Sequence, residues 1–183
     1  MAISEQDRRE LLRLAREAVA AEVSGGPEPT VPPRPGGLLG QRRGCFVTLT
    51  NAGRLRGCIG TFQPHLPLGR QVVEMAREAA RDQRFFADPV TPAELKDLTV
   101  QVSVLSELRL VPDPLDIELG VHGIYVVRGH AAGCFLPEVA AEAGWGKEEF
   151  LSHCCAGKAG LAPDAWRQPG TQVYAFTSEK FSE

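Results

Sequence analysis

The sequence predicts an α+β fold in which a mainly antiparallel sheet is flanked by helices. Extended segments occur in pairs joined by short turns, which indicates hairpins, and helices separate these pairs without a regular strand–helix–strand alternation. The chain has 183 residues, of which 43% are apolar and 23% are charged. This length and composition are typical of one complete domain that buries its core without disulfides or metals.

The N-terminal region is predicted to form a helix over residues 5–22, followed by a Pro/Gly-rich connection over 24–37 and a main body over 38–183. Ser4 and Asp7 have the spacing of a capping box at the start of the helix. The apolar stripe of this helix recurs at helical spacing and consists of Leu11, Leu14, Ala15 and Ala18.

The first part of the main body predicts a hairpin followed by a helix. Residues 44–50 and 55–61 are extended runs on either side of the turn residues 51–53. Pro67 then begins a helix that continues to about Asp82, because a proline costs no hydrogen bond in the first turn.

The second half predicts further strands and short helices. A short helix begins at Thr91, and residues 98–106 alternate apolar and polar side chains as a strand does. A second hairpin is expected from strands over 123–128 and 133–136, joined by residues 129–132. The remaining predicted elements are helices over 137–143 and 147–156 and a closing strand over 172–176.

Charge, hydropathy and cysteine usage exclude several classes. A net charge of −3 and a pI near 5.9 give no overall attraction to nucleic acid or anionic membranes. No apolar run is long enough to span a bilayer, and the polar N-terminus lacks a secretory signal. We therefore expect a cytoplasmic protein with free thiols, no membrane association and no cofactor. No metal site is expected, because the usual ligand spacings are absent among His122, His130, His153, Cys134, Cys154 and Cys155.

The segment Leu55-Arg56-Gly57-Cys58-Ile59-Gly60-Thr61 is the predicted functional centre. Alternation along a strand places Arg56, Cys58 and Gly60 on one face. A guanidinium near a thiol favours the thiolate, which is the nucleophile and the metal ligand, and the flanking glycines indicate a bulge or a close approach by a ligand. The alternative is that Cys58 is simply packed, as free cysteines often are.

Several motifs together resemble the AMMECR-type domain family, called AmmeMemoRadiSam system protein A in many bacteria. The resemblance covers almost the whole chain, in order and spacing. It rests on Gly44-x-Phe46-Val47-Thr48-Leu49, Leu55-Arg56-Gly57-Cys58-Ile59-Gly60, Asp82-x-Arg84-Phe85, Val102-Ser103-Val104-Leu105, Gly123-Ile124, Phe135-Leu136-Pro137, Phe150-Leu151, Lys158-Ala159-Gly160-Leu161 and Trp166.

The resemblance implies one domain over residues 1–183 with a larger and a smaller lobe, and a site at the Arg-Gly-Cys-Ile-Gly run. It also implies a shared system with radical-SAM and Memo-type proteins, but no established reaction. Two features depart from the family. Glu138 stands where a glutamine is usual, and one extra residue precedes Lys158, which shifts the helical register by about 100°.

These residues support two main hypotheses and one weaker hypothesis. The first is a small enzyme or enzyme subunit that acts on a small molecule, with Cys58 as nucleophile or ligand, Arg56 binding an anionic group and His122 as base. Its remaining binding residues would be Gly57, Ile59, Gly60, Thr61, Arg84 and Lys158. The second is a non-catalytic adaptor that binds a partner protein across Arg56 to Thr61. Nucleic-acid binding is the weaker hypothesis, because Glu74, Glu78 and Asp82 interleave with Arg70, Arg77, Arg81 and Arg84.

Overall fold

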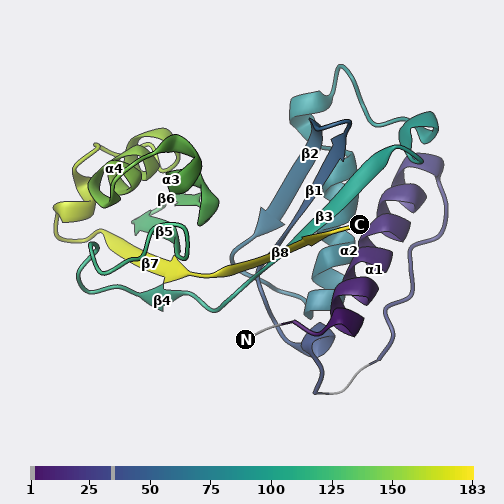
Figure 1. Cartoon of the computed structure of the whole chain (residues 1–183), viewed down its shortest axis with the longest axis horizontal. Helices are drawn as coiled ribbons and strands as arrows, with labels where there is room; N and C mark the ends of the chain where they lie inside the picture. Colours follow the sequence, from purple (N-terminus) through teal and green to yellow (C-terminus); the bar gives the residue numbers. More distant parts are fainter. Residues whose placement is uncertain (1–2, 34–35) are drawn as a thin grey trace. The chain divides into compact units, whose positions relative to one another are not determined.

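The structure is a computed structural model that describes residues 3–33 and 36–183, and it divides into two compact units (Figure 1). The larger unit comprises the chain up to Leu105 together with Glu179–Glu183, and the smaller unit comprises Ser106–Ser178. Each unit contains a four-stranded sheet. The predicted α+β class with mainly antiparallel sheet is confirmed. Residues 34 and 35 of the predicted connection lie outside the described residues.

The larger unit packs two helices on one face of a sheet with the strand order β2-β1-β3-β8 (Figure 1). Its helices are α1 (Glu5–Ser24) and α2 (Leu68–Ala80), and its strands are β1 (Cys45–Asn51), β2 (Arg54–Thr61), β3 (Leu98–Leu105) and β8 (Ser178–Ser182). Three short 3₁₀ helices complete it: η1 (Leu38–Gly40), η2 (Gln83–Phe85) and η3 (Pro92–Glu94). Alternate strand residues face the helices and form the core, including Val47, Leu49, Val100 and Val102.

Local sequence signals set the ends of these elements. The Ser4 hydroxyl accepts a hydrogen bond from the Asp7 backbone N–H, as the capping pattern predicts. The β1–β2 hairpin turns through Ala52 and Gly53, which both have positive φ, 48° and 78°. Two residues of this conformation match the twist of the strands, so the turn fixes the hairpin register.

The smaller unit has a sheet with the strand order β4-β7-β5-β6. Its strands are β4 (Arg109–Leu110), β5 (Gly123–Arg128), β6 (Ala131–Phe135) and β7 (Gln172–Phe176). Its helices are α3 (Glu138–Ala143), α4 (Lys147–Gly157) and the 3₁₀ helix η4 (Ala165–Arg167). Its core contains Ile124, Val126, Phe150, Leu151 and Trp166.

The structure corrects two strand predictions. The chain does not close with β7, because β8 follows and joins the sheet of the larger unit beside β3. Only Phe181 of β8 is buried, and its other residues are polar, so the strand has too weak an apolar pattern to be predicted. The β5–β6 turn is Gly129-His130 alone, since Ala131 already pairs with Arg128. Among the described residues, no helix has both the length and the apolar composition to cross a membrane.

Candidate functional site

A β-bulge at Arg56 interrupts the strand that carries the predicted centre. Leu49 of β1 lies opposite Gly57, and the next residue, Thr50, lies opposite Leu55, so Arg56 has no partner on β1. An extra residue of this kind breaks the alternation of faces along the strand. Cys58 and Gly60 pair with Thr48 and Phe46 and keep a common face. The predicted face shared by all three residues is therefore wrong for Arg56.

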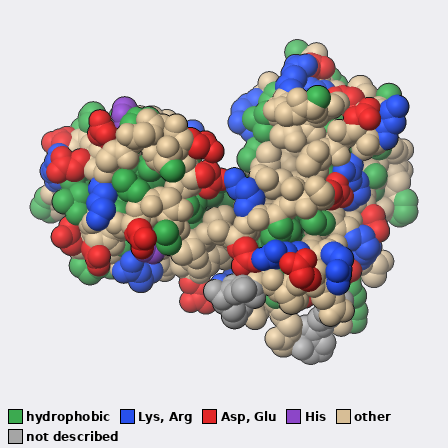
Figure 2. Space-filling model, viewed as in Figure 1, with side chains coloured by type: hydrophobic (Ala, Val, Ile, Leu, Met, Phe, Trp, Pro, Cys, Tyr) green, Lys and Arg blue, Asp and Glu red, His purple; other side chains and the backbone are tan. Residues whose placement is uncertain are grey.

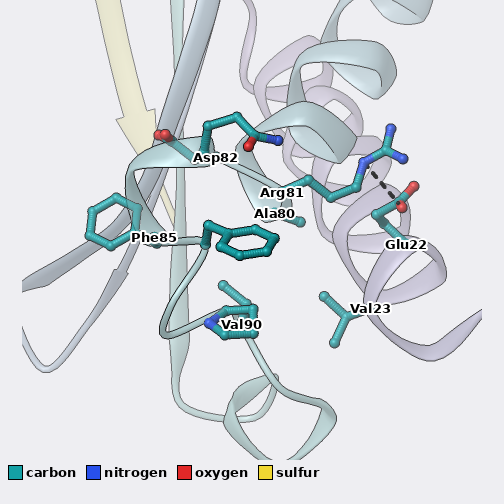
Figure 3. A pocket seen from close by; sticks show the side chains of 10 residues that line it. Glu22, Val23, Ala80, Arg81, Asp82, Phe85 and Val90 are labelled. Atoms are coloured by element: carbon teal, nitrogen blue, oxygen red, sulfur yellow. Dashed lines mark ion pairs between the residues drawn. The ribbon is translucent and has the colours of Figure 1, made fainter.

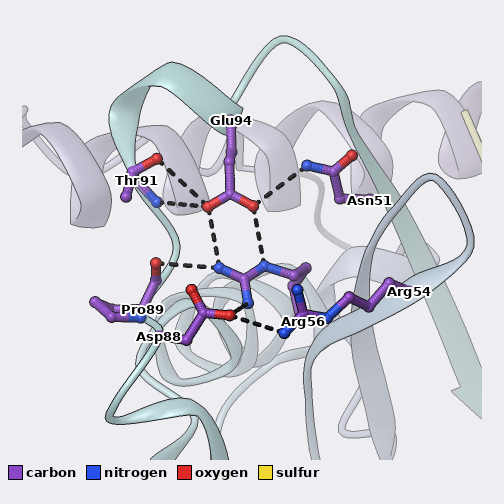
Figure 4. Close-up of polar contacts among 7 residues, drawn as sticks. All are labelled: Asn51, Arg54, Arg56, Asp88, Pro89, Thr91 and Glu94. Atoms are coloured by element: carbon purple, nitrogen blue, oxygen red, sulfur yellow. Dashed lines mark hydrogen bonds and ion pairs between the residues drawn. The ribbon is translucent and has the colours of Figure 1, made fainter.

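The Arg56 side chain is only 3% exposed and is surrounded by acceptors (Figure 4). Its Nε and Nη2 donate to the two carboxylate oxygens of Glu94, each at 3.0 Å. Its Nη1 donates to Asp88 at 3.0 Å, and Nη2 also donates to the Pro89 carbonyl at 3.1 Å. These contacts satisfy the buried charge. Arg56 therefore fixes the segment after η2 against β2, and its guanidinium is already committed to protein groups.

Glu94 is the acidic centre of this network. It also accepts hydrogen bonds from the Asn51 side chain at 3.2 Å and from the Thr91 backbone N–H at 3.1 Å. The bidentate hydrogen bond from Arg56 is the main reason that the pKa of Glu94 is lowered from 4.5 to about 2. The carboxylate therefore stays ionised at any physiological pH.

Asp82 and Arg84 together occupy the position of a neighbouring strand beside Cys58. β2 is at the end of its sheet, so the Cys58 peptide groups that point away from β1 lack a strand partner. The Asp82 carboxylate accepts from the Cys58 N–H at 3.0 Å, and Arg84 Nη2 donates to the Cys58 carbonyl at 3.0 Å. Asp82 also bonds to Arg84, and this bond is the main reason that the pKa of Asp82 is lowered to about 2. This pair protects the strand edge and fixes the Cys58 backbone.

Cys58 is a partly exposed residue, and it pairs with Thr48, so its side chain lies on the sheet face opposite the core residues Val47 and Leu49. Its Sγ lies 3.1 Å from the Thr48 hydroxyl, directly across the β1–β2 pair. The nearest guanidinium to its backbone is that of Arg84, whose side chain is 57% exposed. Arg84 thus holds the position beside Cys58 that the sequence assigned to Arg56.

The two glycines of the segment are explained by packing. A Cβ on Gly57 would lie 2.0 Å from the carbonyl oxygen of Ala79 in α2, so the close approach of α2 to β2 at this position requires a glycine. A Cβ on Gly60 would lie 2.3 Å from the Phe46 ring, which covers that position. Both glycines admit protein atoms, and neither position is left open for a ligand.

The other predicted binding residues of the segment have local roles. Ile59 packs against the core of the larger unit. The Thr61 hydroxyl accepts from the Gln63 N–H at 3.1 Å and donates to the Gln63 carbonyl at 3.2 Å. These contacts of Ile59 and Thr61 do not involve Cys58.

His122 and Lys158 belong to the smaller unit, whereas Cys58 belongs to the larger one. His122 Nδ1 accepts a hydrogen bond from the Glu118 N–H at 3.0 Å. Lys158 follows the end of α4, and its ammonium lies 5.7 Å from the centre of the Phe135 ring. The contacts of these two residues are thus within their own unit.

Charges of both signs are interspersed on the visible faces of the two units (Figure 2). Arg77 of α2 pairs with Glu22 of α1 at 2.8 Å, and Arg81, which directly follows α2, pairs with Glu78 at 2.9 Å. Within residues 3–33 and 36–183, no three or more His, Cys, Asp or Glu side chains are grouped so as to hold a metal ion.

Comparison with known proteins gives one consistent result. The AMMECR1 family model matches residues 12–181, which is most of the chain. The chain belongs to the AMMECR1 family. An AMMECR1-family protein of Methanothermobacter thermautotrophicus is 42% identical over 192 residues, covering 99% of this chain and 96% of that protein. One from Thermococcus gammatolerans is 42% identical, covering 94% of this chain and 88% of that protein.

A solved structure has the same AMMECR1 fold. The crystal structure of an uncharacterised protein, PH0010, from Pyrococcus horikoshii is similar with a TM-score of 0.87 and 38% identity. The similarity covers 99% of this chain and 93% of that chain. The resemblance predicted from the motifs is therefore confirmed, and the names of these relatives state no activity.

Removing the Arg56 charge is expected to destabilise the protein strongly. In Arg56→Met, Glu94 and Asp88 lose a buried partner, so the free energy of unfolding should fall by about 3 kcal/mol. Arg56→Lys should not restore it, because an ammonium cannot form the paired hydrogen bonds to Glu94. Urea unfolding followed by far-UV circular dichroism measures the loss.

Arg54→Met is the matched control for this test. Arg54 also contacts Asp88, at 2.8 Å, but its side chain is 70% exposed. We expect a change within about 0.5 kcal/mol. Equal effects of the Arg54 and Arg56 substitutions would contradict the assigned role of Arg56.

The two depressed carboxyl pKa values predict acid sensitivity. A carboxylate whose pKa is lower in the folded state stabilises that state fully above its unfolded pKa. For Asp82 and Glu94, the stabilisation is lost as pH falls from about 5 towards 2, on the order of 2 kcal/mol for each group. Urea unfolding at several pH values tests this. The Glu94→Gln protein should be less stable at pH 7, and its free energy of unfolding should depend less steeply on pH. A pH dependence as steep as that of the wild type would be evidence against the network.

Gly57→Ala is expected to disturb the contact between α2 and β2. The added Cβ meets backbone, which cannot rotate away, so the protein should lose about 2 kcal/mol of stability. Gly157→Ala is the control, because nothing lies within 4 Å of its added Cβ. It should be neutral or slightly stabilising, by up to about 1 kcal/mol. Thermal melting of both variants measures the two changes in stability. A Gly57→Ala protein as stable as the wild type would contradict the close contact between α2 and β2.

Proposed function

We propose that this AMMECR1-family protein acts on a small molecule, as an enzyme or an enzyme subunit, through the thiol of Cys58. The observation that carries the proposal is that Cys58 is a partly exposed residue whose Sγ lies 3.1 Å from the Thr48 hydroxyl. Cys45, Cys154 and Cys155 are buried, and burial raises the pKa of the Cys134 thiol. Of the five thiols, Cys58 is therefore the best placed to react or to hold a ligand.

Arg84 is the proposed contact for an anionic group of the substrate. Its Nε and Nη2 bond to Asp82 and to the Cys58 carbonyl, and its side chain is still 57% exposed. Arg56 is unsuited to this role because its charge is already matched by two carboxylates and a carbonyl. Asp82 is a poor proton acceptor for the thiol, since its pKa is about 2.

The proposed setting is the cytoplasm, where thiols remain reduced, in a shared system with Memo-type and radical-SAM proteins. The family resemblance supports those partners. An adaptor surface across Arg56 to Thr61 has less support, because Arg56 and Gly57 are buried. Nucleic-acid binding also has less support, since the charges of Arg77 and Arg81 are paired with Glu22 and Glu78.

Cys58→Ser should abolish the activity while leaving the fold intact. Serine retains a hydroxyl that can bond to Thr48, but it is a far weaker nucleophile and metal ligand than a thiol. In a strain that lacks the gene, this variant should reproduce the metabolite profile of the deletion, with at least about a hundredfold loss of the affected conversion. Arg54→Met should restore the wild-type profile.

Alkylation of the folded protein controls for accessibility. Iodoacetamide should modify Cys58 first, as its sulfur bonds to the methylene carbon and iodide leaves, with Cys134 next and the three buried thiols only after unfolding. Mass spectrometry identifies the modified residue. If the deletion strain has an altered metabolite profile and the Cys58→Ser gene restores the wild-type profile, the thiol role is refuted and the adaptor hypothesis is favoured.

A further inference from the structure

A hollow of about 440 Å³ lies in the larger unit, at the ends of α1 and α2 (Figure 3). Its wall is mainly apolar and includes Val23, Ala80, Phe85, Phe86, Pro89 and Val90. A volume of this size can accommodate an aromatic side chain with room to spare. Cys58 does not line the hollow, but Asp82, which accepts a hydrogen bond from the Cys58 N–H, does.

Phe86 lines the hollow and is 82% exposed, the highest value among the exposed large apolar residues in the part of the chain that the structure describes. An aromatic ring in water is a candidate anchor for a protein interface. The segment that carries it is held on both sides, by the bonds of Asp82 and Arg84 to Cys58 and by the bonds of Arg56 to Asp88 and Pro89. Less entropy is lost when a ring that is already positioned is buried by a partner.

The charges around the hollow balance one another. Arg81 pairs with Glu22 at the edge of the hollow, at 3.3 Å (Figure 3). Arg81 also pairs with Glu78, at 2.9 Å. Arg54 pairs with Asp88, two residues beyond Phe86, at 2.8 Å. A balanced rim neither attracts nor repels a strongly charged partner, and it is compatible with a surface that has the same mixture.

We propose that this surface binds a second copy of the chain. A two-fold interface uses the same patch on both molecules, so the patch must contain both a projecting group and its receptor. This patch contains both: Phe86 of each copy would enter the hollow of the other, and the Arg81–Glu22 pairs would border the contact. A contact centred on one hollow and one aromatic ring is smaller than a standard interface of roughly 20–30 residues a side, so we expect the dimer to be weak and concentration-dependent.

Analytical ultracentrifugation of the full chain tests the proposal. We expect reversible dimers between about 10 μM and 1 mM, with a reductant present so that the free thiols cannot cross-link the copies. Phe86→Ser should weaken association at least about tenfold, because two rings lose their burial. Leu110→Ser is the matched control, since Leu110 is also an exposed large apolar residue, at 49%, but lies in the smaller unit. It should associate as the wild type does.

The receptor side is tested by Ala80→Phe, which fills the hollow and leaves Phe86 in place. Ala80→Phe should weaken association as much as Phe86→Ser does. If circular dichroism shows that the Ala80→Phe protein does not fold, Val23→Phe is used in its place. A mixture of the Phe86→Ser and Ala80→Phe proteins should associate more strongly than either alone, because one intact contact is restored. A wild type that stays monomeric at about 1 mM, or dimers unaffected by either substitution, would overturn the proposal.

Discussion

The buried charge of Arg56 is the constraint on which the rest of this surface depends. At 3% exposure its guanidinium has lost nearly all its water, and Glu94, Asp88 and the Pro89 carbonyl replace that hydration. Because these acceptors lie more than thirty residues along the chain, the bonds tie residues 88–94 to β2. The Asp82–Arg84 pair ties the start of the same segment to Cys58. The segment between these attachments has little freedom to move.

This arrangement changes the meaning of the Leu-Arg-Gly-Cys-Ile-Gly run. Arg56 holds a loop, Gly57 admits a helix backbone, Ile59 packs in the core and Gly60 lies under an aromatic ring. Cys58 differs from these residues because its backbone is fixed on the strand edge while its thiol remains partly exposed. Most of the run therefore positions one side chain, and the chemistry that we propose belongs to Cys58 with Arg84 beside it.

The sequence predicts the helices and strands that have a strong apolar periodicity. It does not predict contacts between residues that are far apart along the chain. β3 and α2 bury one complete face each, so their alternating and helical patterns were visible. The bulge has no signature of its own, and an alternation rule applied across it gave Arg56 the wrong face. Glu94 was missed because an acidic residue 38 positions away reveals its partner only in the folded chain. Asp82 was visible in the Asp-x-Arg-Phe motif, but its bond to the Cys58 N–H was not.

Structural and chemical roles in this surface can be separated by the kind of substitution. A change at Arg56 or Gly57 displaces the 82–94 segment or α2, so a loss of function there reports on geometry rather than on chemistry. Cys58→Ser alters one partly exposed atom and leaves both backbone bonds of residue 58 in place. Because the same anchored segment also presents Phe86, damage to the Arg56 network would affect the thiol and the hollow together. Substitutions at the two surfaces themselves would affect only one of them.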